Sequence, residues 1–396
     1  MQEIVDRLAA DDQGAQIAKT LLYPYLNHAA TMFESGYATA DDINASMRFG
    51  CGYPIGPLAL VDALGAKTVV AGLEAQFAAT GDPLHQPAPV LVAQANDGST
   101  FAAAGAAGDA PKPQLRHDIR TVGVVGTGTM ASGIVEVFAK SGFDVVFVGR
   151  GEDKVAGVTT AITKSLDKAV SRGKLDQAGK DAVLARLTGA TSREALADVD
   201  IVVEAIAEDL DIKLELFRDL DRICKPGAIL ATTTSSLSIA DCAGATSRPQ
   251  DVIGMHFFNP APVMKLVEVV TTGLTSAEVD ETVHALCDAT GKVSVSCGDR
   301  AGFIVNALLF PYLNDAVLLH EAGTSMDEID EALKETKLPM GPFQLLDVVG
   351  NDVSLAIQQT LVGTFGHEGW KPASLLEQKV AEGKLGRKTG EGFHTY

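Results

Sequence analysis

Apolar positions in the central part of the chain follow the pattern of buried strands separated by helices. Short apolar runs occur at TVGVVG (121–126), DVVFVG (144–149) and DIVVEAI (200–206), and stretches such as ASGIVEVFAKSG (131–142) carry apolar residues at helical spacing. Continuous apolar strands that alternate with helices are typical of a parallel sheet buried on both faces. The pattern predicts a doubly wound α/β domain over residues 119–298.

The segments on either side of this domain are helical in pattern and resemble each other. LLYPYLNHAATMFESG (21–36) matches LLFPYLNDAVLLHEAG (308–323), and YPIGPLALVDALG (53–65) matches LPMGPFQLLDVVG (338–350). A repeat that keeps its spacing marks one structural unit used twice. Both copies therefore predict small helical domains, interrupted by Pro-Ile-Gly-Pro and Pro-Met-Gly-Pro turns.

These patterns divide the 396 residues into four parts, which agrees with the two or three domains expected from length. We expect a degenerate helical copy over 1–98, a linker rich in Gly, Ala and Pro over 99–118, the α/β domain over 119–298 and a second helical copy over 299–396. The expected fold class is thus an α/β Rossmann-type doubly wound domain flanked by two all-α helical domains.

The first apolar strand runs directly into a glycine-rich turn, GTGTMA (126–131), and a helix follows. Gly126 permits the tight turn, Gly128 lets the backbone approach a pyrophosphate, and the helix N-terminus offers N–H donors. The alternative is a plain glycine turn, but the strand–turn–helix context favours a dinucleotide site. We expect Gly126, Gly128, Thr129 and Met130 to contact the cofactor.

The end of the second strand bears on the choice between NAD and NADP. An acidic residue at this position takes the ribose hydroxyls of NAD, whereas this chain has Gly149-Arg150. Loss of the carboxylate removes repulsion against a 2′-phosphate, and Arg150 can pair with that phosphate. The alternative is that Arg150 is a solvated turn residue. The cofactor is expected to be NAD or NADP, and the pair Gly149-Arg150 favours NADP.

A histidine and a carboxylate stand out in the segment GMHFFNPAPVMKLVEVV (254–270). His256 is flanked by apolar residues, which predicts a position at the end of a strand. Glu268 is an isolated carboxylate inside an apolar strand, and a buried carboxylate needs a partner. The alternative is a purely structural histidine. A His256–Glu268 pair would fix the histidine tautomer and stabilise the imidazolium formed on proton uptake.

Over residues 119–396 the sequence resembles the L-3-hydroxyacyl-CoA dehydrogenase family of fatty-acid β-oxidation. The resemblance rests on motifs in the family's order and spacing: the GxGxM turn, VVEAIAEDLDIK (202–213), SSLSI, HFFNPAPVMKLVEV, GFIVN (302–306) and GRKTGEGF (386–393). It implies hydride transfer between C3 of a short- or medium-chain 3-hydroxyacyl-CoA and a nicotinamide cofactor. Two other functions stay open: a dehydrogenase of a free hydroxy acid, and a structural protein that binds the cofactor without turnover.

The resemblance also implies roles for four positions in catalysis. His256 would be the general base in alcohol oxidation and the general acid in reduction, and Glu268 would orient it. Ser235, from the SSL segment, and Asn306, from GFIVN, would hydrogen-bond the substrate oxygens.

Four further positions match binding contacts of the family. Glu208 and Lys213 match positions beside the nicotinamide ribose, and Ser165 and Arg172 match contacts to CoA. The basic residues of the segment 164–174 also form a cationic face at helical spacing. A CoA phosphate would account for this face, and so would an exposed charged helix.

The N-terminal copy departs from the family, because it resembles the C-terminal helical domain but lies ahead of the α/β domain. It has Lys19 where the second copy has Asn306, and its chemistry is lost while its packing pattern is kept. In this family the C-terminal domain commonly forms the dimer interface. We therefore expect residues 1–98 to pack on 299–396 as an internal pseudo-dimer. The alternatives are a homodimer, a free appendage, or a copy that serves a different interface.

Charge and cysteine content restrict the partners further. The chain has 32 Lys and Arg against 51 Asp and Glu, a net charge of −19. Such an acidic protein repels nucleic acids and anionic membranes, so neither is an expected partner. Five scattered cysteines without a CxxC pair predict neither disulfides nor a metal site. With no pattern of a signal peptide or membrane span, we expect a cytoplasmic protein.

Overall fold

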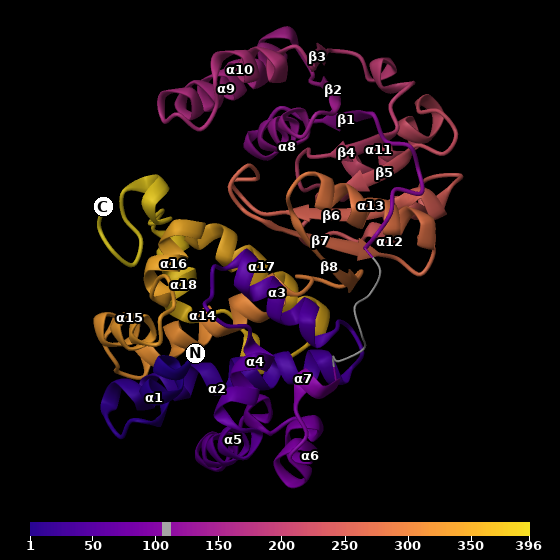
Figure 1. The fold of residues 1–396 in the computed structure, drawn as a ribbon. Helices are drawn as coiled ribbons and strands as arrows, with labels where there is room; N and C mark the ends of the chain where they lie inside the picture. Colours follow the sequence, from indigo (N-terminus) through magenta and orange to yellow (C-terminus); the bar gives the residue numbers. More distant parts are fainter. Residues whose placement is uncertain (105–111) are drawn as a thin grey trace. The chain divides into compact units, whose positions relative to one another are not determined.

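A computed structural model describes residues 1–104 and 112–396, which form two compact units (Figure 1). One unit contains the helices from both ends of the chain, and the other contains the residues between them up to Arg300. The two helical copies, predicted as separate domains, therefore share one compact unit.

The second unit is built on one sheet of eight strands in the order β3-β2-β1-β4-β5-β6-β7-β8. Its strands are β1 (Thr121–Val125), β2 (Asp144–Val148), β3 (Leu187–Ala190), β4 (Ile201–Glu204), β5 (Ile229–Thr232), β6 (Val252–Phe257), β7 (Leu266–Thr271) and β8 (Val293–Gly298). Strands β1 to β6 are parallel, as predicted.

The prediction of a parallel sheet is wrong for the last two strands. β7 pairs with β6 in antiparallel orientation, and β8 is parallel to β7. The segment 258–265 that joins β6 to β7 is too short for a crossover, which takes a dozen residues or more. The chain therefore turns back, and β7 runs against its neighbour.

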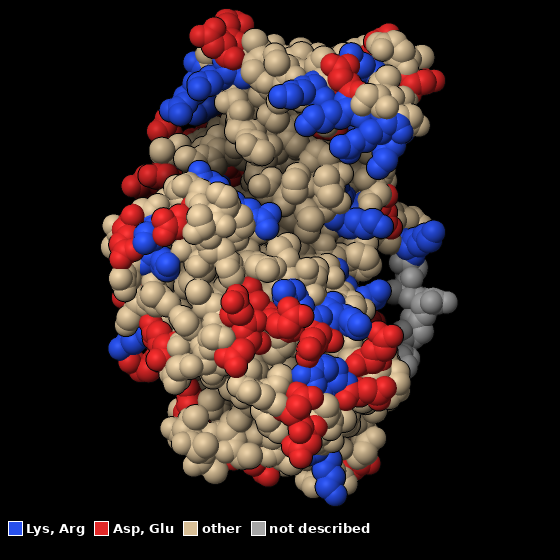
Figure 2. All heavy atoms as spheres, turned by 90° about the vertical axis from the view of Figure 1, so that its left-hand side faces the viewer, with Lys and Arg blue, Asp and Glu red and all other residues tan. Residues whose placement is uncertain are grey.

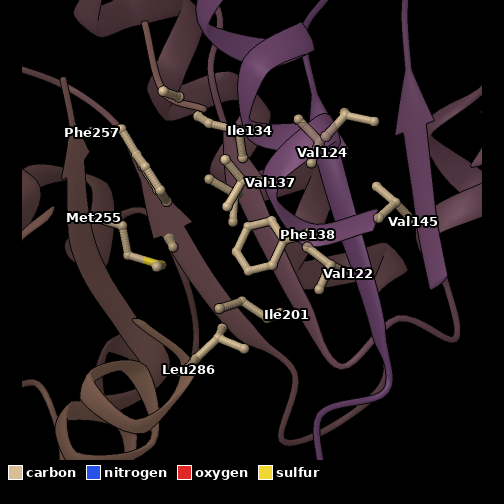
Figure 3. Packing of buried hydrophobic residues seen from close by; sticks show 14 of the residues in the cluster. Val122, Val124, Ile134, Val137, Phe138, Val145, Ile201, Met255, Phe257 and Leu286 are labelled. Atoms are coloured by element: carbon tan, nitrogen blue, oxygen red, sulfur yellow. The ribbon is translucent and has the colours of Figure 1, made fainter. Parts of the chain in front are cut away.

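Helices cover both faces of this sheet (Figure 1). They are α8 (Thr129–Lys140), α9 (Glu152–Ser171), α10 (Gln177–Leu184), α11 (Leu210–Ile223), α12 (Ile239–Gly244) and α13 (Ala277–Ala289), with the 3₁₀ turns η2 (Arg193–Leu196) and η3 (Pro249–Asp251). Alternate strand residues such as Val122 and Val124 form one buried cluster with apolar residues of α8, α9 and α13. Figure 3 shows the ring of Phe138, from α8, among Val122 and Ile201 of this cluster.

The helical unit contains two sets of corresponding helices. Helix α1 (Gln2–Ala9) comes before the first set and has no counterpart in the second. The first set is α2 (Gln13–Glu34), α3 (Ala40–Gly50), α4 (Pro57–Leu64), α5 (Ala66–Thr80), η1 (Pro83–His85), α6 (Pro89–Asp97) and α7 (Phe101–Ala104). The second set is α14 (Val305–Glu321), α15 (Met326–Glu335), α16 (Pro342–Val349), α17 (Asn351–Phe365), η4 (Glu368–Trp370), α18 (Ser374–Ala381) and η5 (Arg387–Thr389).

The two sets are held together internally by the same kinds of hydrogen bonds. Asn27 of α2 donates to Leu84 and Gln86 and accepts from the amide of Ala88, and Asn314 of α14 does the same with Lys371 and Ala373. These buried amides connect each long helix to a distant loop, where the loop's backbone groups need partners.

An aspartate fixes the end of each copy, and the one in the second copy, Asp347, is buried. Asp347 accepts from the amides of Phe393 and His394 at 2.8 Å each, and Asp62 accepts from the amides of Phe101 and Ala102 at 3.0 and 2.9 Å. The segment 99–104 thus packs on the first copy, although its sequence shares little with GRKTGEGF.

The linker is therefore shorter than the predicted 99–118. Its first residues belong to the helical unit, and its last residues are attached to the sheet unit, where the amides of Arg116 and His117 donate to Thr282. The middle part, residues 105–111, lies outside the described residues.

The two copies pack against each other through their long helices. α2 lies against α14 and α15, and the rings of the corresponding residues Tyr25 and Tyr312 meet with centroids 5.9 Å apart. Arg7 pairs with Glu335 at 2.7 Å at the edge of this contact. Such pairing of equivalent side chains is the geometry of an isologous interface.

The acidic charge is concentrated in the helical unit. This unit has 11 Lys and Arg against 25 Asp and Glu, whereas the sheet unit, counted from residue 110, has 21 against 26. Figure 2 shows Lys and Arg side chains gathered near the top of the view, where α9 and α10 lie. Among the described helices, none combines the length and apolar character needed to cross a membrane.

Candidate active site

The carboxyl ends of β1, β2 and β4 border a cavity of about 1000 Å³ in the sheet unit. It is lined by the turn 126–130, the segment 148–154 after β2 and the residues 205–207 after β4. Strand order changes direction between β1 and β4, and ligands of doubly wound sheets bind at this switch point.

The glycine turn has the conformation that a dinucleotide requires. Gly126 has a φ of +136°, and a Cβ there would lie 2.3 Å from the carbonyl oxygen of Ala205. Gly128 caps α8, and a Cβ on it would meet no protein atom within 4 Å, so the backbone stays open towards the cavity. Thr129 and Met130 line the cavity at the start of α8. The turn and helix N-terminus therefore fit the pyrophosphate of a nicotinamide dinucleotide.

The residue after β2 is restricted by the side chain of the turn. A Cβ on Gly149 would lie 2.5 Å from Cγ2 of Thr127, so an acidic residue cannot stand here unless Thr127 moves. Beside it, Arg150, Lys154 and Arg193 line the cavity, and the guanidinium of Arg193 pairs with Asp219. Two carboxylates line the same region, Glu152 and Asp153 in the first turn of α9, so its charge is mixed.

The predicted histidine–carboxylate pair is present at the carboxyl end of β6. His256 and Glu268 are direct partners in the β6–β7 ladder, and Nδ1 of His256 lies 2.6 Å from Oε2 of Glu268. His256 is 7% exposed and Glu268 is fully buried. The pair exists because β7 runs antiparallel to β6, which is the feature of the sheet that the sequence pattern did not predict.

Ser235 lies on the neighbouring loop, three residues beyond β5. Its amide donates to Oε1 of Glu208 at 2.9 Å, and Thr234 Oγ1 donates to the same oxygen. Burial acts to raise the pKa of Glu208, but Lys213, Thr234 and Ser235 outweigh it and hold the pKa below its ordinary value. Because β5 and β6 are parallel neighbours, Ser235 and His256 come to the same edge of the sheet.

Lys213 is buried rather than open to a ligand. Its side chain is 1% exposed, and Nζ donates to both carboxylate oxygens of Glu204 at 2.7 and 2.8 Å. A third contact reaches Glu208 at 3.3 Å. Glu204, at the end of the apolar strand β4, was not among the expected site residues. The reasoning that singled out Glu268, a carboxylate inside an apolar strand, applies equally to Glu204.

The residues expected to bind CoA lie on and next to α9. Ser165 donates to the buried carboxylate of Glu136 on α8 at 2.9 Å, and Arg172 is exposed at the C-terminal end of α9. A second cavity of about 510 Å³ lies beside Glu136 and extends to the segment 259–262 after β6.

Asn306 belongs to the helical unit and lies in the first turn of α14, where it is 8% exposed. Its role as a substrate contact stays a prediction. Within residues 1–104 and 112–396, no group of three or more His, Cys, Asp or Glu residues is arranged to hold a metal ion.

The sequence of the chain matches the models of one protein family. The family model of the 3-hydroxyacyl-CoA dehydrogenase NAD-binding domain matches residues 121–300, and that of the C-terminal domain matches residues 17–107 and 302–396. The chain is 44% identical over 275 residues to a 3-hydroxybutyryl-CoA dehydrogenase of Clostridioides difficile, which covers 69% of this chain and 98% of the relative.

Two further similar proteins are also dehydrogenases of hydroxyacyl-CoA substrates by name. The mitochondrial hydroxyacyl-coenzyme A dehydrogenase of Homo sapiens is 43% identical over 296 residues, which covers 70% of this chain and 91% of the relative. The crystal structure of (S)-3-hydroxybutyryl-CoA dehydrogenase from Ralstonia eutropha superposes with a TM-score of 0.69 at 41% identity, over 70% of this chain and 99% of that one. The chain is an oxidoreductase that belongs to the 3-hydroxyacyl-CoA dehydrogenase family.

Proposed function

We propose that this enzyme interconverts a short- or medium-chain 3-hydroxyacyl-CoA and the corresponding 3-ketoacyl-CoA, and that His256 transfers the proton of the reacting hydroxyl. The observation that supports this most directly is the contact of 2.6 Å between His256 and the fully buried Glu268. A buried carboxylate on Nδ1 fixes the tautomer in which Nε2 exchanges the proton. The bound nicotinamide cofactor supplies the acceptor or donor of the hydride.

In the oxidative direction, Nε2 of His256 takes the proton of the C3 hydroxyl while the carbinol carbon loses its hydride. The imidazolium that forms is stabilised by Glu268, which lies on Nδ1. Ser235 positions the substrate oxygen by a hydrogen bond, and Asn306 is proposed as a further hydrogen-bonding residue for the substrate. In reduction the same groups act in reverse, and His256 donates the proton.

The CoA moiety is proposed to bind along α9. Arg172 and the neighbouring lysines would pair with CoA phosphates, and the cavity beside Glu136 offers room for the pantetheine arm. Retention of Ser165 and Arg172 favours a CoA thioester over a free hydroxy acid. The His256–Glu268 pair and the open glycine turn favour an active enzyme over a cofactor-binding structural protein.

We propose NADP as the preferred cofactor. A 2′-phosphate would lie near the end of β2, where Gly149 removes the repelling carboxylate and Arg150 can pair with it. The close approach of Thr127 to this glycine supports the proposal, because it excludes an acidic side chain from the position. Lys154 adds a second basic residue to the lining of the same cavity, whereas the guanidinium of Arg193 pairs with Asp219.

The experiment that tests this function is a steady-state assay with acetoacetyl-CoA and its longer homologues, with NADH and with NADPH. Turnover of the CoA thioesters, with little or none of free acetoacetate, is the expected result. Turnover of the free acid alone would favour the second function. No turnover with either would favour a structural protein. A cytoplasmic location stays a prediction.

We also propose that the N-terminal copy takes the place of a second subunit. α2 covers the face of α14 with the equivalent side chains Tyr25 and Tyr312 in contact, as at a two-fold interface. Ion pairs join the copies at the rim, from Arg7 to Glu335 and from Glu3 to Lys337.

The full chain is therefore expected to be a monomer of 41.3 kDa in light scattering. Deletion of residues 1–98 exposes the apolar face of α14, so the shortened chain should dimerise or lose at least about 5 °C in Tm. A shortened chain that stays a stable, fully active monomer would contradict the proposal. A dimer of the full chain would contradict it as well.

A further inference from the structure

We propose that Glu204 is a positioning residue for the substrate-binding loop, acting through Lys213 and Glu208 on Ser235. The inference rests on the proposed function of Ser235 and adds a residue to which no role in the reaction is assigned. It is carried by an unbroken chain of contacts from the interior of the sheet to the loop that follows β5.

The chain begins with a carboxylate whose oxygens are both satisfied. Oε1 of Glu204 accepts from Nζ of Lys213 and from the amide of Ile206, both at 2.7 Å. Oε2 accepts from Lys213 at 2.8 Å and from the hydroxyl of Thr232 at 2.6 Å. Thr232 is the residue paired with Glu204 in the β4–β5 ladder, so the carboxylate bridges two strand ends. A fully buried charge with four donors is held in one position.

Lys213 connects the carboxylate of Glu204 to that of Glu208. An ammonium group has three donors, and Lys213 uses them on the two oxygens of Glu204 and on Oε2 of Glu208 at 3.3 Å. Because Lys213 is 1% exposed, the ligand side of the site meets Glu208 and not the ammonium group.

Glu208 in turn holds the loop by several donors on one oxygen. Oε1 accepts from the amide of Ser235 at 2.9 Å and from the hydroxyls of Thr234 and Ser236. Without the attraction of the Lys213 ammonium group, the Glu208 carboxylate would be held less firmly beneath the loop. The buried pair is therefore arranged to keep the Ser235 side chain in one place against the substrate oxygen.

The test replaces Glu204 by glutamine in the full-length enzyme and measures two quantities. First, hydrogen–deuterium exchange of the peptide that contains the Ser235 amide should become faster, because the carboxylate beneath it loses its anchor. Second, kcat/KM for acetoacetyl-CoA should fall about 100-fold, since misplacement of a positioning group by about 1 Å has effects of this size.

Asp200→Asn is the matched control. Asp200 directly precedes the same strand and accepts from the amides of Arg120 and Thr121 and from Lys225, at the opposite edge of the sheet. This variant should lower Tm but leave both the exchange of the loop and kcat/KM unchanged. Glu204→Asp is the second variant, for the case in which Glu204→Gln does not fold. It keeps a negative charge opposite Lys213 but withdraws the carboxylate by one methylene from its donors, so it should change both quantities in the same direction by about 3- to 10-fold.

Unchanged loop exchange, or unchanged kcat/KM, in a folded Glu204 variant would overturn the inference. An equal loss of kcat/KM in Asp200→Asn would overturn it too, because the effect would then be one of general stability. If the unmodified enzyme does not turn over acetoacetyl-CoA, the proposed function fails. If the enzyme is active and the Glu204 variant shows faster loop exchange with unchanged kcat/KM, the contacts are real but have no role in the reaction, and the inference fails.

Discussion

Replacement of His256 by glutamine is expected to lower kcat for acetoacetyl-CoA reduction by a factor of about 10²–10⁴, the usual contribution of a positioned general acid or base. Glutamine retains a polar group near Glu268 but can neither donate nor accept the proton at neutral pH. Binding of the CoA and of the cofactor does not depend on this proton transfer, so KM should change by less than about 3-fold. Stopped-flow or steady-state absorbance of the reduced nicotinamide measures the rate.

A second histidine of the same unit provides the control. His284 on α13 is half-buried, and its Nδ1 lies 2.7 Å from Oγ of Ser294 while its Nε2 lies 2.9 Å from Oγ of Ser296. His284→Gln should keep kcat within about 2-fold of the unmodified enzyme while Tm falls, since each ordinary hydrogen bond that is lost contributes about 1 kcal/mol. If His256→Gln retains near-normal turnover, His256 is not the proton-transferring residue.

The sequence predicts the architecture of the sheet unit well because its signals are local. Apolar strands such as TVGVVG and the glycine turn determine their own conformation, and parallel strands of a doubly wound sheet follow from the alternation with helices. The reversed direction of β7 could be read from the shortness of the 258–265 segment, which leaves no room for a crossover. Strand composition alone does not carry that information.

The repeat predicts that the two helical copies pack on each other, but it does not show which side chains meet. Leu-rich helices such as 21–36 predict a buried face without saying which face meets which partner. The pairing of Tyr25 with Tyr312 follows from symmetry once the repeat is noticed. The role of Phe101, whose amide binds Asp62 as Phe393 binds Asp347, depends on backbone geometry and leaves little trace in the letters STFAAAG.

Site residues were predictable in proportion to how unusual they are for their surroundings. His256 and Glu268 break an apolar pattern, and the structure brings them within 2.6 Å. Glu204 breaks the same kind of pattern and was missed, because its partner Lys213 lies nine residues on and on a helix that looks amphipathic. The contact of Thr127 with the Gly149 position joins two separate turns, and only the fold brings them together.

The distribution of charge is compatible with the proposed binding of two phosphorylated ligands by an acidic enzyme. Of the net charge of −19, the helical unit carries −14 and the sheet unit −5. Both the glycine turn and the basic residues of α9 belong to the sheet unit, whose smaller net negative charge repels an anionic ligand less strongly. The N-terminal copy therefore adds acidity where no phosphate is expected to bind.

The preference of the enzyme for NADPH over NADH should depend on Arg150. The unmodified enzyme is expected to favour NADPH over NADH in kcat/KM by about 10- to 100-fold, since a hydrogen-bonded charge pair contributes about 1.5–3 kcal/mol. Arg150→Ala should remove most of this preference by weakening NADPH, with NADH nearly unaffected. A strong preference of the unmodified enzyme for NADH would refute the proposal.

Reversal of the preference needs both positions to change. Gly149→Asp alone places its Cβ 2.5 Å from Cγ2 of Thr127, so it should lower Tm and reduce activity with both cofactors. Thr127→Gly combined with Gly149→Asp removes that contact, and the new carboxylate repels a 2′-phosphate and accepts from the ribose hydroxyls of NADH. The ratio of kcat/KM should then move towards NADH by about 100-fold or more, while Thr127→Gly alone leaves it within about 3-fold. Equal ratios in the double variant and the unmodified enzyme would show that the end of β2 does not select the cofactor.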